Sequence, residues 1–107
     1  MFENAPTQKL NVILHAPTAN ALQRARNNAR NLKKEVPLAD IRIIVNAEAV
    51  AAALEVADAS LDEITWICPN TLQRLGKTLR EPLNLLPDPA ILELVRLQQS
   101  GWVYIRA

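Results

Sequence analysis

The sequence predicts an α/β fold with a parallel sheet, because short apolar runs alternate with longer segments of helical period along the whole chain. A length of 107 residues suits one domain and is too short for two. Half of the residues are apolar and 21% are charged, as in globular chains that bury a core and unlike disordered ones. We therefore expect a single domain over residues 1–107.

Two strands and two helices are expected in the first half of the chain. Alternating apolar residues predict a strand over 9–15, and the following Thr18 is a suitable N-cap. Apolar residues three or four positions apart predict a helix over 19–34. A run of isoleucine and valine predicts a central strand over 41–45, and an alanine-rich helical pattern follows over 48–57.

The second half is expected to add three strands and two helices. A strand is predicted over 64–67, and a helix over 69–76 begins at a proline and ends at a glycine, the residues typical of those positions. Two prolines leave room only for a short strand within 83–86. A last helix over 89–101 is again framed by proline and glycine, and a final strand is expected over 102–106.

Composition excludes several kinds of site. One cysteine and one histidine cannot supply the four protein ligands of a structural zinc centre, so we expect no metal. The two glycines, Gly76 and Gly101, are too far apart for a P-loop and too few for a dinucleotide fingerprint. The N-terminus lacks the basic and apolar stretches of a signal peptide, and no apolar run approaches the roughly 20 residues of a membrane span. We expect a cytoplasmic protein with no membrane partner.

Charge is spread unevenly along the chain. The net charge of +1 gives no general field that would attract nucleic acid, so we expect no nucleic-acid partner. Residues 1–34 nevertheless carry six basic and one acidic side chain, whereas residues 35–65 carry one basic and seven acidic ones. Four of the basic residues lie beside the apolar stripe of the first predicted helix: Arg26, Arg30, Lys33 and Lys34. A solvated helix face explains them, and contact with RNA or with an acidic partner is the alternative.

Three polar or reactive residues end the first three predicted strands: His15, Asn46 and Cys68. Ligands of open α/β sheets bind at the carboxyl ends of the strands, so these residues form one site if the strand order brings them together. Cys68 precedes a helix, whose first N–H groups favour a nucleophilic thiolate over a thiol. The alternatives are a cysteine packed as a small apolar residue and a histidine with a structural role rather than an acid–base role.

Four segments of the chain resemble one known family. CPNTL at 68–72 and ELVRLQQSGWVYI at 93–105 resemble the DsrE/DsrF-like sulfur-metabolism family. NARNL at 28–32 and VNAEAV at 45–50 are similar to the Asn-rich helix and the Asn-Gly-x-x-Val turn of the same family, although Ala47 stands where the family often has glycine. The resemblance covers nearly the whole chain.

The resemblance implies a three-layer α/β/α sandwich with a mainly parallel five-stranded sheet, assembled into a homo-oligomer that is a trimer or a hexamer. It also implies that Cys68 accepts sulfane sulfur as a persulfide and relays it, so that the partners are a sulfur donor and an acceptor protein. No cofactor is implied. The expected pocket residues, which would orient the donor or hold an anion, are His15, Asn46, Asn70 and Thr71.

Two other functions remain open. One is a non-catalytic oligomeric module that binds a small ligand or a protein at the strand ends, with Cys68 packed in the core. The other follows from the C-P-N-T segment at 68–71, which also resembles the monothiol motif of glutaredoxin-like proteins. Its position argues against that second reading, because the glutaredoxin motif follows the first strand of the core and this segment follows the third predicted strand.

Overall fold

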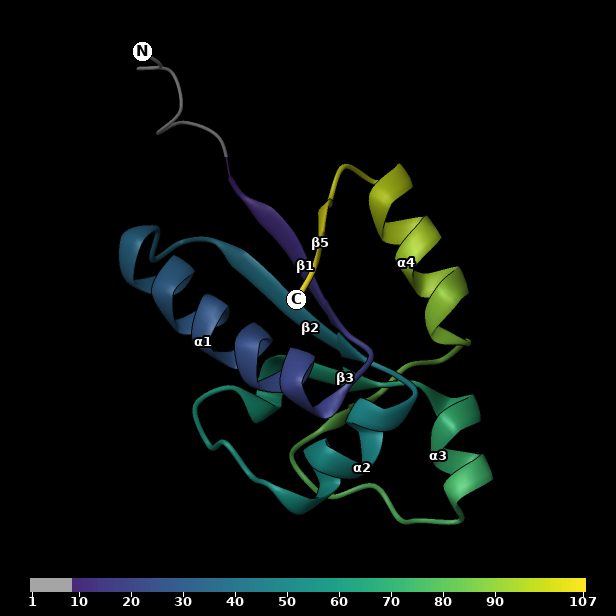
Figure 1. The fold of residues 1–107 in the computed structure, drawn as a ribbon. Coiled ribbons are helices and arrows are strands. Elements are labelled where there is room, and N and C mark those ends of the chain that lie inside the picture. Colours follow the sequence, from purple (N-terminus) through teal and green to yellow (C-terminus); the bar gives the residue numbers. More distant parts are fainter. Residues whose placement is uncertain (1–8) are drawn as a thin grey trace.

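A five-stranded parallel sheet forms the centre of the molecule, and helices cover both of its faces (Figure 1). The computed structural model describes residues 9–107. The elements follow in the order β1 (Asn11–Ala16), α1 (Ala19–Glu35), β2 (Asp40–Val45), α2 (Glu48–Glu55), the short 3-10 helix η2 (Asp62–Ile64), β3 (Thr65–Ile67), α3 (Pro69–Leu75), β4 (Asn84–Leu85), α4 (Ala90–Gln99) and β5 (Val103–Arg106). The predicted α/β sandwich around a parallel sheet is thus confirmed.

The strand order is β4-β3-β2-β1-β5, so the chain first moves outward from β1 and then returns to its other side. Crossovers between parallel strands are right-handed, and a reversal of direction therefore moves the crossover helix to the opposite face of the sheet. In agreement, α1 and α2 cover one face and α4, which leads back to β5, covers the other (Figure 1). The two edge strands are the short β4 and β5.

The helix signals in the sequence act as expected, with small shifts at the boundaries. The Thr18 hydroxyl accepts a hydrogen bond from the Ala21 N–H at 3.0 Å and caps α1. Gly76 ends α3 in the left-handed conformation at φ 64°, which glycine adopts without a steric penalty. Pro89 precedes α4 as its N-cap and is not its first residue, and Ile64 belongs to η2 instead of β3.

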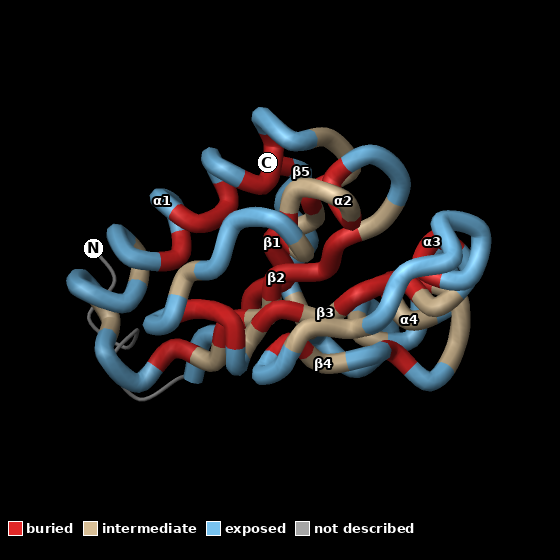
Figure 2. Tube along the Cα trace, turned by 90° about the horizontal axis from the view of Figure 1, so that it is seen from below, coloured by how far each residue is buried: buried red, intermediate tan, exposed pale blue. Residues whose placement is uncertain are grey.

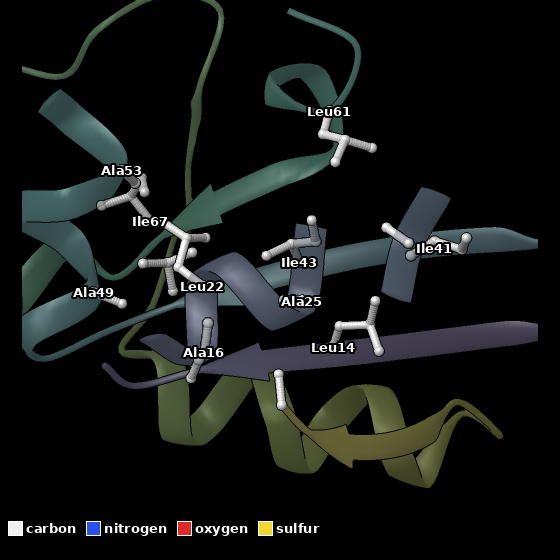
Figure 3. Packing of buried hydrophobic residues seen from close by; sticks show 14 of the residues in the cluster. Leu14, Ala16, Leu22, Ala25, Ile41, Ile43, Ala49, Ala53, Leu61 and Ile67 are labelled. Carbon is white, nitrogen blue, oxygen red and sulfur yellow. The ribbon is translucent and has the colours of Figure 1, made fainter. Parts of the chain in front are cut away.

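The larger of two apolar clusters lies between the sheet and the helices α1 and α2. Buried stretches concentrate in the central strands and on the inner side of α1 (Figure 2). Figure 3 shows Leu14 and Ile43 of the sheet packed beneath Leu22 and Ala25 of α1. Alanines at the contact let the helix approach the strands closely, because their side chains occupy little space.

The smaller cluster lies under α4 and reaches the carboxyl end of β3. It joins Ile13 and Ile44 of the central strands to Ala90 and Leu94 of α4 and includes Cys68. Successive side chains of a strand point to opposite faces, so the residues of this cluster mark the face of the sheet on which the candidate site lies.

Candidate functional site

The carboxyl edge of the sheet places Asn46 between His15 and Cys68. Val45 of β2 pairs with Ile67 of β3, so Asn46 and Cys68 follow as neighbours on adjacent strands. On the other side, Nε2 of His15 lies 2.9 Å from Oδ1 of Asn46. The strand order therefore brings together the three residues that end the first three predicted strands.

His15 is held on both of its ring nitrogens. Besides the contact to Asn46, its Nδ1 lies 2.6 Å from the hydroxyl of Tyr104 on β5, with the ring centroids 5.7 Å apart. An amide oxygen only accepts hydrogen bonds, so in the neutral ring Nε2 carries the proton and Nδ1 accepts from the Tyr104 hydroxyl. The chain Tyr104–His15–Asn46 thus fixes the tautomer and orientation of the imidazole.

Tyr104 was not among the expected site residues. It reaches His15 because β5 pairs with β1 in a register that sets Tyr104 opposite Ile13, two residues before His15 on the same face. The alternation of Trp102 and Tyr104 marks a strand in the sequence but does not tell which strand it joins. Tyr104 can be placed at the site only once the pairing of the first and last strands is known.

Cys68 lies where the N-termini of two helices meet. It is the N-cap of α3 and shares an apolar cluster with Ala90 at the start of α4, and the backbone N–H groups of Asn70, Thr71 and Ala90 lower the pKa of its thiol. Burial raises the pKa of the thiol, but hydrogen bonding from Ala90, Thr71 and Asn70 outweighs burial, so the pKa lies below the ordinary value. The site therefore favours the thiolate.

Thr71 connects the cysteine to the turn after β2. Its hydroxyl stabilises the Cys68 thiolate, and its Oγ1 accepts a hydrogen bond from the Ala47 N–H at 3.3 Å. Ala47 has a φ of 50° and a ψ of −135°, a backbone conformation that glycine adopts far more readily than alanine. The turn that bears Asn46 is therefore strained and is attached to the cysteine through Thr71.

The remaining expected residue acts differently from its prediction. The side chain of Asn70 is exposed, and the residue contributes to the cysteine environment through its backbone N–H. Cys68 itself is 5% exposed and belongs to the same apolar cluster as Ile13, Ile44 and Leu94. The sulfur is therefore sheltered by α4, with little surface open to solvent.

The basic side chains of α1 do not form a free cationic face. Arg26 is buried beside Asp62, and Arg30 pairs with Asp58 at 2.7 Å between Nη1 and Oδ2. Lys33 donates a hydrogen bond to the Ala39 carbonyl at 2.9 Å. The interpretation of these residues as a solvated face is therefore wrong for Arg26, which lies in the interior.

Within residues 9–107, no group of three histidine, cysteine, aspartate or glutamate side chains is placed to hold a metal ion. Over the same residues, no helix combines the length and apolar character that crossing a bilayer requires. Comparison with protein-family models and with curated proteins finds no match to this chain.

Proposed function

We propose that the protein is a DsrE/DsrF-like sulfur carrier in the cytoplasm that accepts sulfane sulfur on Cys68 as a persulfide and relays it to an acceptor protein. The observation that carries the proposal is the position of the sulfur against the N–H groups of Asn70, Thr71 and Ala90, from two helices at once. Both helix N-termini favour negative charge, and a thiolate is the form of cysteine that attacks sulfur. A single cysteine also suits transfer between proteins, because it cannot form a disulfide within the chain.

The transfer balances without an oxidant. The Cys68 thiolate attacks the terminal sulfur of a donor persulfide, R–S–SH, and forms a new S–S bond. The donor S–S bond breaks, and R–S⁻ leaves with the electron pair. An acceptor thiolate then attacks the terminal sulfur on Cys68, which regenerates the Cys68 thiolate and leaves the persulfide on the acceptor.

His15 and Asn46 supply the polar side of the pocket in this proposal. The imidazole is oriented by Tyr104 and Asn46, and Asn46 neighbours Cys68 across the β2–β3 pair. A persulfide carries its charge on the outer sulfur, so the amide N–H group of Asn46, whose oxygen is held by His15, would stabilise the loaded state beside the cysteine. Asn70 and Thr71 act at the other side, where they stabilise the resting thiolate.

Intact-mass spectrometry tests sulfur loading directly. Reduced protein is incubated with polysulfide, and the Cys68→Ser variant serves as the control. We expect the wild type to gain sulfur that a mild thiol removes, and the variant to gain none. A wild type that gains no sulfur under conditions that load a known persulfide-forming thiol contradicts the proposal.

One observation favours a second function. Cys68 is 5% exposed and belongs to the apolar cluster beneath α4, which is the environment of a packed cysteine. In that case the chain is a non-catalytic module that binds a ligand or partner at the strand ends. Iodoacetamide separates the two functions: a carrier is alkylated in the native state below neutral pH, and a packed thiol only after denaturation.

Homo-oligomerisation is part of the proposal because β5 is an edge strand of the described sheet. Within residues 9–107, β5 pairs only with β1, and its Val103 and Ile105 are 54% and 44% exposed. Unpaired edges with apolar side chains favour association with another chain. Light scattering at micromolar concentration should give the mass of a trimer or a hexamer, and the mass of a monomer would contradict the assembly.

A further inference from the structure

A second polar centre lies on the other face of the sheet, between α1 and α2, which run side by side (Figure 1). A cavity of about 440 Å³ opens here, within the size range of small-molecule sites. Its walls combine apolar residues such as Leu22 and Val56 with the polar side chains of Gln23 and Asn27. Arg26 and Arg30, one helical turn apart on α1, also line it.

Arg26 is the unusual member of this wall. Its side chain is 8% exposed, and its Nε and Nη2 atoms have no hydrogen-bond partner within the described part of the chain. Nη2 lies 3.7 Å from Oδ1 of Asp62, too far for a hydrogen bond, and among residues 9–107 that oxygen also has no hydrogen-bond partner. Buried guanidinium nitrogens without a hydrogen-bond partner are costly, so an acceptor closer than Asp62 would stabilise this edge of Arg26.

The charges around Arg26 leave an excess of one positive charge. Arg26, Arg30 and Arg80 face only Asp58 and Asp62 in this cluster. Nη1 of Arg80 binds Oδ2 of Asp62 at 2.8 Å, and Nη1 of Arg30 binds Oδ2 of Asp58 at 2.7 Å. Arg26 is therefore the cation whose nearest carboxylate, Asp62 at 3.7 Å, lies within ion-pair distance but beyond hydrogen-bond distance.

We propose that the cavity between α1 and α2 binds a small organic anion, whose carboxylate or phosphate group is held by Arg26 and Arg30. The Nε and Nη2 atoms form one edge of the guanidinium, and such an edge binds two oxyanion oxygens at once. Binding requires the Arg26 guanidinium to turn from Asp62 toward the cavity, and Asp62 keeps Arg80 as its partner. Asn27 and Gln23 offer amide donors to the same group, and the apolar wall accommodates the rest of the ligand.

Isothermal titration with inorganic phosphate and with citrate tests the proposal, with sodium chloride at equal ionic strength as the reference. We expect saturable binding of one of the two anions to one site per chain, which also tells whether a phosphate or a carboxylate is preferred. Charge-assisted hydrogen bonds predict that Arg30→Gln weakens binding by about tenfold or more. Val56→Trp, which fills the cavity from an exposed position without changing charge, should abolish binding.

Lys34→Gln is the matched control, because it removes the same charge from the exposed end of α1 outside the cavity. We expect its affinity to stay within about twofold of the wild type, since exposed charges are screened by salt. Absence of saturable binding below about 10 mM, a threshold of weak affinity, overturns the proposal. Equal weakening by Lys34→Gln, or full binding by Val56→Trp, overturns it as well.

Discussion

The two polar centres of this molecule hold charge in different ways on opposite faces of one sheet. Around Cys68, backbone N–H groups at the starts of α3 and α4 favour the thiolate, and their positions are fixed by the helices themselves. Around Asp62, three arginine side chains share two carboxylates, and two nitrogens of Arg26 have no hydrogen-bond partner in the described part of the chain. Backbone donors need no side-chain ordering, so the first centre follows from the fold, whereas the second depends on the simultaneous placement of long side chains.

The largest effect is expected where the arginine cluster loses its central carboxylate. Asp62 is 1% exposed, binds Arg80 at 2.8 Å and accepts from the Asp58 N–H at 3.2 Å. Asp62→Ala should lower the free energy of unfolding by about 3–5 kcal/mol, because buried guanidinium groups lose their counter-charge. Urea denaturation measures this loss.

The exposed pair Arg96–Asp88 provides the control for that measurement. Its atoms approach to 2.8 Å, but the side chains are 56% and 40% exposed. Asp88→Ala should therefore change the unfolding free energy by less than about 1 kcal/mol. Equal losses for the two aspartates would show that burial does not distinguish the pairs.

A smaller effect is expected at the cysteine centre when Thr71 loses its hydroxyl. Thr71→Val leaves the Ala47 N–H without its acceptor and removes a donor from Cys68. We expect a loss of about 1–3 kcal/mol in stability and slower alkylation of Cys68 below neutral pH, because the thiol pKa rises. Denaturation and the pH profile of iodoacetamide labelling measure the two effects.

Thr65→Val separates the two readouts. Thr65 is also buried, and its hydroxyl donates to the Leu61 carbonyl at 2.8 Å. This variant should lose stability without any change in the pH profile of Cys68, since Thr65 does not contribute to the thiol environment. If Thr65→Val also shifted the pH profile of Cys68 labelling, the slower labelling in Thr71→Val would result from general loosening of the fold and not from the lost hydroxyl.

Strain at Ala47 predicts a gain in stability at the same centre. At φ 50° and ψ −135°, alanine is in a region that costs about 1–3 kcal/mol and that glycine enters freely, although glycine also loses more entropy on folding. Ala47→Gly should therefore raise the unfolding free energy by about 1 kcal/mol. Ala53→Gly, in the interior of α2, should lower it by about the same amount. Destabilisation by both substitutions would show that Ala47 is unstrained.

The sequence predicted those parts of the two centres that depend on local signals. Hydrophobic periodicity and the positions of prolines and glycines predict the strands and helices. They therefore also predict that His15, Asn46 and Cys68 lie at strand ends, whatever the strand order. The Ala90 N–H and Tyr104 were missed because both come from the return of the chain across the sheet to the far side of β1. Periodicity alone does not determine that return.

Burial of Arg26 was missed for a similar reason. In the helical pattern it lies at the border of the apolar stripe, where a long charged side chain is ordinarily solvated. Its partner Asp62 comes from η2, far along the chain, and the cavity requires α1 and α2 together. Neither contact has a local signature, and the whole fold is needed to show that this arginine lies in the interior.

The smallest expected effect is a pH-dependent contribution of Cys68 to the free energy of unfolding. A thiol whose pKa is lower in the folded than in the unfolded state releases its proton first in the folded state. Its contribution is therefore fully present above the unfolded pKa of about 8.5 and is lost as pH falls through the folded pKa. Relative to Cys68→Ser, the wild type should gain stability as pH rises through this window, with a slope of at most about 1.4 kcal/mol per unit. The converse slope in paired denaturation curves would mean that burial outweighs the two helix N-termini and that Cys68 remains a thiol.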